Sequence, residues 1–203
     1  MSEPQPVYLE PYARAADQYG AGFRALLWAS PNTQRARFDA LMRLVDLKGR
    51  SVLDVGCGRA DLLDHLLSKN IRPVHYVGLE AVPALSDAAE AKRHAEAMFV
   101  RADFVREPVR MLVGADVVYF SGSLNTLDAA AFYRTIRLAY EGAAETLVFN
   151  FLCSPLLAGA AYLHWRPPTE VIAFARTLTG DVRKLDDYLD GDCTLALAKP
   201  AEH

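Results

Sequence analysis

The stretch Ser51-Val52-Leu53-Asp54-Val55-Gly56-Cys57-Gly58-Arg59-Ala60-Asp61-Leu62-Leu63 decides the fold of this chain of 203 residues. Its first half carries the branched apolar residues of a buried strand. Because glycine has no Cβ, Gly56 and Gly58 let the backbone turn tightly and approach a ligand closely. A helix beginning near Ala60 would direct its free N–H groups at that ligand. The stretch therefore predicts a cofactor site where the strand meets the helix.

Two kinds of cofactor are compatible with a strand, a glycine loop and a helix in this order. A dinucleotide fingerprint requires a third glycine at position 61, where this chain has Asp61. A carboxylate in that place repels a pyrophosphate and attracts a cation. The sequence thus favours a positively charged cofactor over NAD(P). A glycine turn that only closes a βα unit is the simpler alternative.

Acidic residues follow the next two predicted strands. The segment 75–80 reads as a strand that ends in Glu80, 24 positions after Gly56. An α/β nucleotide site places its acceptor for ribose hydroxyls at about this distance from the glycines. Residues 97–104 read as a third short strand that is followed, within the same segment, by Ala102-Asp103-Phe104. We expect these acids to lie at the carboxyl edge of one sheet, where open α/β sheets bind their ligands.

The rest of the chain alternates predicted helices and strands. Residues 1–10 are proline-rich and predict a loose arm. A helix is expected over 14–29, and Ser30-Pro31-Asn32-Thr33 would end it and cap the next helix. Further strands are expected near residues 115–120, 146–152, 182–188 and 193–199, and further helices over residues 84–95, 128–140 and 169–178.

This alternation predicts an α/β fold, a Rossmann-like three-layer sandwich with helices on both faces of a mostly parallel sheet. The turn at Asp190-Gly191 predicts a hairpin, so the last of seven strands would be antiparallel. We expect one structural domain overall, with residues 1–48 as an N-terminal arm and helical lid and residues 49–203 as the catalytic domain.

Composition excludes several classes of partner. The formal net charge of −3 argues against nucleic acid, since binding it requires a basic surface. The longest apolar stretch, residues 147–163, is interrupted by Asn150, Pro155 and Gly159, which argues against a membrane span.

The cysteines Cys57, Cys153 and Cys193 have no metal-ligand spacing, so no metal site is expected. Their odd number and predicted burial indicate reduced thiols and a cytoplasmic protein. The N-terminus has no basic start and no apolar core, so it does not read as a signal peptide.

The D-x-G-x-G pattern of Asp54, Gly56 and Gly58 resembles motif I of the class I S-adenosylmethionine-dependent methyltransferases. This resemblance implies that Asp54 helps to hold the methionine ammonium and that Glu80 accepts from the ribose hydroxyls. It also implies that Asp103 accepts from the adenine amine. The antiparallel final pair of strands is a feature of the same superfamily. The implied cofactor-binding residues are Asp54, Gly56, Cys57, Gly58, Glu80, Ala81, Asp103, Phe104 and Ser121.

A narrower resemblance covers nearly the whole chain from about residue 12. It is to a group of small, uncharacterised bacterial class I methyltransferases. Its segments are Trp28-Ala29-Ser30, Gln34, Arg37-Phe38, Val52–Gly58, Tyr119–Asn125, Phe149–Leu152 and Asp187-Tyr188-Leu189. The chain departs from that pattern at Asp186, where a histidine is expected. A base role for that histidine therefore does not carry over.

The acceptor is expected to meet the segments that follow the fourth and fifth strands. Asn125 would orient it, and His164 would serve as the base if a proton must be removed. The alternative for His164 is packing between its aromatic neighbours. Tyr19, Trp28 and Arg37 are expected to belong to the substrate lid.

A small-molecule acceptor follows by elimination. The chain has no N/D-P-P-Y motif and no Pro-Cys pair after the fourth strand, and no insertion that would recognise a macromolecule. We expect a methyltransferase that works as a monomer or homodimer. The alternatives are an NAD(P)-dependent oxidoreductase and a non-catalytic S-adenosylmethionine-binding partner protein.

Overall fold

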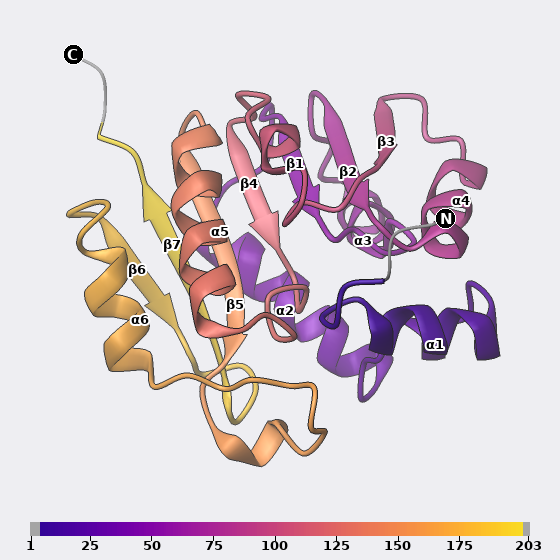
Figure 1. The fold of residues 1–203 in the computed structure, drawn as a ribbon. Coiled ribbons are helices and arrows are strands. Elements are labelled where there is room, and N and C mark those ends of the chain that lie inside the picture. The colour runs from indigo at the N-terminus through magenta and orange to yellow at the C-terminus, as the bar shows by residue number, and fades with distance from the viewer. Residues whose placement is uncertain (1–4, 201–203) are drawn as a thin grey trace.

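The computed structural model describes residues 5–200, and a single sheet runs through it (Figure 1). Its strands are β1 (Val52–Val55), β2 (Tyr76–Glu80), β3 (Ala97–Arg101), β4 (Val117–Phe120), β5 (Thr146–Leu152), β6 (Val182–Leu185) and β7 (Asp192–Ala198). Their order is β3-β2-β1-β4-β5-β7-β6. The strands β1 to β5 pair in parallel, whereas β7 runs antiparallel to both β5 and β6. The predicted fold class, with its antiparallel last strand, is confirmed.

Helices cover both faces of this sheet. The α-helices are α1 (Glu10–Tyr19), α2 (Pro31–Leu44), α3 (Asp61–Ser68), α4 (Pro83–Ala91), α5 (Ala129–Gly142) and α6 (Pro168–Ala175). Three short 3-10 helices are η1 (Phe23–Leu26), η2 (Pro108–Met111) and η3 (Pro155–Leu157). No helix within residues 5–200 has both the length and the apolar character that crossing a membrane requires.

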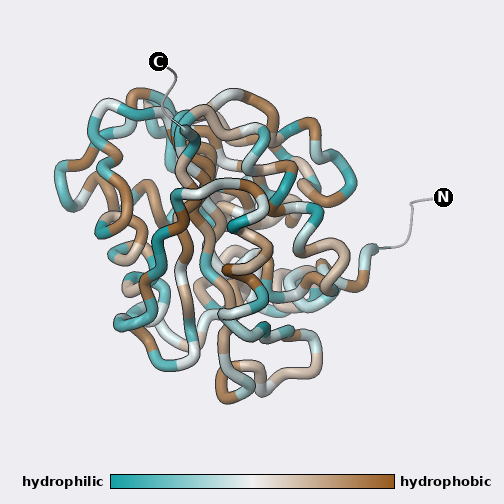
Figure 2. Tube along the Cα trace, turned by 90° about the vertical axis from the view of Figure 1, so that its left-hand side faces the viewer, coloured by the Kyte–Doolittle hydropathy of each residue, from teal (hydrophilic) through white to brown (hydrophobic). Residues whose placement is uncertain are grey.

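The side chains of β4 alternate between two buried cores. Val117 and Tyr119 pack with apolar residues of α2 and α3, whereas Val118 and Phe120 pack with those of α5 and α6. This follows from the period of two along a strand, which sends successive side chains to opposite faces. Both cores are needed because a parallel sheet is buried on its two faces. The apolar segments accordingly run through the middle of the trace in Figure 2.

The N-terminal region differs from the prediction in two places. The helix expected over 14–29 ends at Tyr19, because Gly20 takes a left-handed φ of 60° and the chain turns into η1. The expected loose arm is also wrong for the residues that the structure describes. Tyr8 is half-buried against the core and hydrogen-bonded to Asp103. Residues 1–4 lie outside the described part of the chain.

The capping cluster before α2 has the predicted role. Ser30 Oγ accepts from the Thr33 N–H at 3.2 Å, and Thr33 Oγ1 accepts from the Ser30 N–H at the same distance. This reciprocal pair fixes where α2 begins. The elements before it, α1 and η1, lie beyond the carboxyl ends of the parallel strands, with α1 at the lower right of Figure 1.

Candidate functional site

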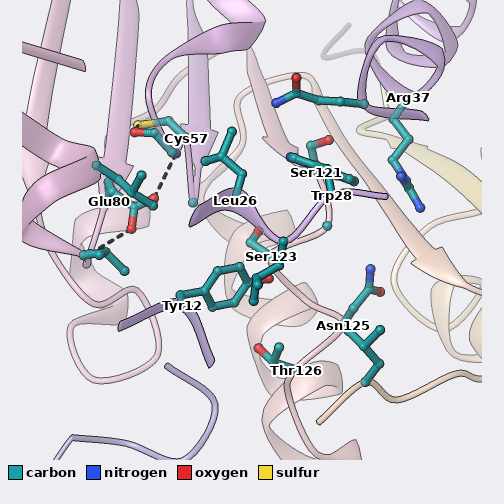
Figure 3. A pocket seen from close by; sticks show the side chains of 18 of the residues that line it. Tyr12, Leu26, Trp28, Arg37, Cys57, Glu80, Ser121, Ser123, Asn125 and Thr126 are labelled. Atoms are coloured by element: carbon teal, nitrogen blue, oxygen red, sulfur yellow. Dashed lines mark hydrogen bonds between the residues drawn. The ribbon is translucent and has the colours of Figure 1, made fainter. Parts of the chain in front are cut away.

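A cavity of about 290 Å³ lies where the carboxyl ends of β1, β2 and β4 meet the N-terminal helices. Figure 3 shows side chains from both regions turned toward it. Eleven of the residues expected from the sequence line it: Trp28, Arg37, Asp54, Gly56, Cys57, Gly58, Glu80, Ala81, Phe104, Ser121 and Asn125. Three do not line it: Tyr19, Asp103 and His164.

The glycine loop is closely packed from two sides. Gly56 has φ 76°, and a Cβ there would lie 2.5 Å from Ser123 Cβ in the loop after β4. Gly58 has φ 57°, and a Cβ there would lie 2.7 Å from Leu26 Cδ2 in η1. No other residue type fits either position without displacing these neighbours. The glycines therefore hold two cavity walls in place as well as turning the chain.

Glu80 joins this loop to the beginning of α4. Its carboxylate accepts from the Gly58 N–H and from the Val82 N–H, both at 2.8 Å (Figure 3). Burial raises the pKa of the Glu80 carboxyl, and the two backbone donors oppose that shift. Each carboxylate oxygen has a second lone pair, so Glu80 keeps acceptor capacity for a ligand.

Asp54 is the second buried carboxyl group in the wall. Burial raises its pKa to about 7, while a hydrogen bond from the Tyr76 hydroxyl lowers it and the nearby charges of Glu80 and Asp61 raise it further. Two carboxyl groups so placed favour a positively charged ligand, since a cation between them lowers the cost of their ionisation.

Asp103 lies apart from the main cavity, in an adjoining hollow. Its Oδ2 accepts from the Tyr8 hydroxyl at 2.7 Å, and its Oδ1 accepts from the Val105 N–H at 3.0 Å. Leu9 and Ala81 line both spaces, so the segment that carries Tyr8 divides one hollow into two. The adenine-binding role expected for Asp103 would require this segment to move.

Trp28 covers the loop after β4. A Cβ on Gly122, whose φ is 75°, would lie 2.6 Å from the edge of the Trp28 ring, so the indole rests directly on this glycine. The Arg37 guanidinium lies 4.6 Å from the Trp28 ring centroid. Tyr19 is 39% exposed and contacts Arg24 instead, so this part of the expected lid faces away from the cavity.

Arg37 forms a buried ion pair with Asp192, at the start of β7. Asp192 also accepts from the Tyr188 hydroxyl and, at 3.4 Å, from Asn150 Nδ2. The Asn150 amide oxygen in turn accepts from the Gly122 N–H at 2.7 Å. A single network therefore joins α2, β5, β7 and the loop beneath Trp28.

Sequence reasoning missed Asp192 and its network. The available signal was the position of Arg37, which shares a helical stripe with Gln34, Phe38 and Leu41, at a spacing typical of a buried face. A charged residue on such a face requires a partner of opposite charge. The sequence does not say which of 25 acidic residues is that partner.

The two residues expected to act on the acceptor differ in placement. The Asn125 side chain lines the cavity, and its amide oxygen accepts from the Leu152 N–H at 3.2 Å. His164 is exposed, and only its backbone is near, since its N–H donates to the Asn125 carbonyl at 2.7 Å. The geometry therefore does not support His164 as a base. No histidine of residues 5–200 lines the cavity.

No group of three or more His, Cys, Asp or Glu side chains in the described part of the chain is arranged to hold a metal ion. Cys57 and Cys193 are buried and Cys153 is partly buried, all three as free thiols. Burial raises the pKa of the Cys57 thiol well above its ordinary value.

The network around Asp192 makes a prediction about stability. Asp192→Ala leaves the buried Arg37 charge without its partner, which costs about 3–5 kcal/mol of unfolding free energy. Urea denaturation followed by circular dichroism measures this loss. Asp190→Ala, two positions away in the exposed turn, is the control and should change stability by no more than about 0.5 kcal/mol. Equal stabilities for the two variants would contradict the role of the ion pair.

Asp54 makes a prediction about pH. Its pKa of about 7 in the folded protein lies above the ordinary value of 3.8, so the folded state binds this proton more tightly than the unfolded state. The stabilising contribution is therefore present below pH about 4 and is lost as the pH rises through about 7.

We expect the unfolding free energy to fall less between pH 4 and pH 7 in Asp54→Asn than in the unmodified protein, in urea titrations at each pH. Glu80 contributes with the same sign, so the fall is reduced and not abolished. The exposed Asp17→Asn variant is the control. An unchanged pH dependence in Asp54→Asn would contradict the raised pKa.

Comparisons with known proteins agree with this geometry at the level of the fold. No protein-family model and no curated protein sequence matches the chain. Among solved structures, it is similar to DhpI with bound SAH, at 17% identity, TM-score 0.70 and coverage of 97% of both chains. It is also similar to magnesium protoporphyrin IX methyltransferase (ChlM) from Synechocystis PCC 6803 with bound SAM, at 12% identity and TM-score 0.68, covering 98% of this chain and 100% of that one.

A third similar structure is an O-methyltransferase family protein from Burkholderia thailandensis, at 17% identity and TM-score 0.67, covering 97% of this chain and 67% of that one. The structural neighbours that match nearly the whole chain are class I S-adenosylmethionine-dependent methyltransferases, as the motif I resemblance implied. The chain therefore has the fold of that superfamily.

Proposed function

We propose that this chain binds S-adenosylmethionine and transfers its methyl group to a small-molecule acceptor. The observation that carries the proposal is the pair of buried carboxyl groups, Asp54 and Glu80, beside a glycine loop in the wall of one cavity. This wall fits a ligand that carries both ribose hydroxyls and a positive charge. Bound S-adenosylmethionine would supply an electrophilic methyl group on a sulfonium.

The residues of the cavity have distinct tasks under this proposal. Asp54 attracts the ammonium of the cofactor, and Glu80 accepts from the ribose hydroxyls while it holds the glycine loop. The Phe104 ring, fixed edge-on to Phe120 at 5.6 Å, offers an apolar surface to the adenine. Asn125 and the hydroxyls of the loop after β4 orient the acceptor.

The chain would contribute mainly by positioning. Methyl transfer from a sulfonium is an in-line displacement, and holding the nucleophile in line can supply about 7–11 kcal/mol of the barrier. Trp28 and the N-terminal segment screen the cavity from water.

A dinucleotide is the main competing ligand, and Asp61 argues against it. Its carboxylate stands where a dinucleotide loop needs a glycine, and it accepts from Gln34 Nε2 at 3.2 Å and from Arg59 at 3.0 Å. The buried carboxyl groups of Asp54 and Glu80 would further repel a pyrophosphate.

Thermal unfolding with S-adenosylmethionine, SAH and NADH separates the two ligands, because a ligand that binds only the folded state raises the melting temperature. We expect stabilisation by the first two and not by NADH. Stabilisation by NADH alone would overturn the proposal. Turnover is then tested by incubation with metabolite extracts and mass spectrometry for the gain of one methyl group, with conversion of the cofactor to SAH. SAH bound with no turnover would leave only a binding function.

Glu80 makes the first prediction about binding. Glu80→Gln keeps the volume and one acceptor oxygen but removes the charge that strengthens hydrogen bonds to the ribose. SAH affinity in calorimetry should fall by about ten- to a hundredfold. Glu90→Gln, on the exposed surface of α4, is the matched control and should bind as the unmodified protein does. Unchanged affinity in a folded Glu80→Gln variant would remove the ribose assignment.

Tyr8 makes the second prediction. An adenine amine that bonds to Asp103 Oδ2 competes there with the Tyr8 hydroxyl. Tyr8→Phe removes this competing donor and keeps the ring, so SAH should bind about two- to tenfold more tightly. The gain should vanish in an Asp103→Ala background. Tyr19→Phe, outside the cavity, is the control. Weaker binding in Tyr8→Phe would show that the hydroxyl serves the ligand and does not compete with it.

A further inference from the structure

The half of the cavity that lies away from Glu80 has an apolar wall. Its residues come from the end of β5, the segment after β5, the β6–β7 hairpin and the N-terminal helices. They are Trp28, Leu152, Leu157, Tyr162, Leu163 and Leu189. Because β4, β5 and the hairpin lie on the far side of β1 from β2 and β3, these residues face the space beyond the predicted cofactor site.

The half of the cavity away from Glu80, where the acceptor would bind, has no unpaired charged group within residues 5–200. Of the described residues that line the cavity, only Arg37, Asp54 and Glu80 have a guanidinium or carboxyl group. Figure 3 places Glu80 at one end and Arg37 at the other. The Arg37 charge is matched by Asp192 behind it, with two guanidinium nitrogens bonded to the same carboxylate oxygen. The acceptor end therefore offers no net charge to an ionic group.

Uncharged polar groups remain available in the same wall. Asn125 Nδ2, Thr126 Oγ1 and the Tyr12 hydroxyl form no hydrogen bond with any residue of the described range, and all three side chains line the cavity (Figure 3). Groups of this kind orient an uncharged oxygen or nitrogen atom. They do not compensate an ionised group for its lost hydration.

The apolar wall also reaches the surface. Tyr162 lines the cavity and is 36% exposed. It belongs to the segment after β5, which projects at the lower edge of Figures 1 and 2. The apolar wall is therefore open to solvent at Tyr162.

From these observations we infer that the methyl acceptor is a neutral, largely apolar small molecule with one uncharged polar group that Asn125 and Thr126 orient. The inference rests on the proposed function and names the acceptor class of the same site. An anionic acceptor would lose its hydration at a wall with no unmatched cation, so it is excluded from this class.

The test uses two probes with the same naphthalene ring system, β-naphthol and its carboxylate analogue β-naphthoate. At pH 7 the phenol is neutral and the carboxylate is charged. SAH binding is measured first by calorimetry, and each probe is then titrated into the SAH-loaded protein. We expect β-naphthol to bind about tenfold or more tightly than β-naphthoate.

Two lysine variants locate the probe. Leu157→Lys places a cation in the acceptor wall and should reverse the preference, weakening β-naphthol about tenfold and strengthening β-naphthoate. Leu156→Lys, at the exposed neighbouring position outside the cavity, is the matched control and should change neither affinity. Unchanged SAH affinity in both variants shows that they are folded.

Each result decides between the two levels of the argument. Equal or tighter binding of β-naphthoate to the unmodified SAH-loaded protein, or binding of neither probe, overturns the acceptor class and leaves the proposed function standing. The acceptor class is also overturned if Leu156→Lys changes the two probe affinities in the same way as Leu157→Lys. Failure to bind SAH overturns the proposed function itself, and the acceptor class with it.

Discussion

The structure depends on one buried ion pair, that of Arg37 with Asp192. Removing two charges from water costs several kcal/mol for each, so such a pair persists only where further hydrogen bonds complete it. Tyr188 and Asn150 supply them here. Because Asn150 also holds the Gly122 N–H, the pair couples the helix before the sheet to the loop after β4 that lines the cavity. The N-terminal helices are thus fixed to the carboxyl edge of the sheet and are not an independent appendage.

Three contacts at glycines complete this coupling. Ser123 rests on Gly56, Leu26 on Gly58 and Trp28 on Gly122. Each contact exists because a Cβ is missing, so each fixes the separation between two cavity walls to within the size of one methyl group. The shape of the cavity consequently follows from backbone packing, and its chemistry from the few polar side chains that the packing leaves facing inward.

The sequence predicted those features that depend on local pattern. Periodicity and turn residues located every strand, and the order of Asp54 and Glu80 along the chain placed both in one cavity. The sequence did not predict the features that depend on contacts between distant segments. Nothing near Tyr8 shows that its hydroxyl bonds to a residue 95 positions away. Nothing near His164 shows that the segment after β5 turns its side chain outward, since loop conformation has no period to read. The prediction of one helix over 14–29 was wrong because tertiary packing determines how the Gly-Ala-Gly stretch after Tyr19 folds.

The two buried carboxyl groups of the cavity impose a further electrostatic constraint. Burial raises the pKa of both Asp54 and Glu80, so the folded protein is less stable with these groups ionised than a neutral wall of the same shape would be. The backbone donors of Gly58 and Val82 offset part of this cost at Glu80, whereas Asp54 has the Tyr76 hydroxyl. A cationic ligand would offset the remainder, because it lowers the free energy of the ionised forms. Binding of such a ligand would therefore be coupled to folding stability through the same two carboxyl groups. A lysine or arginine of the chain placed beside them would also stabilise the fold, but it would occupy the space that the ligand needs.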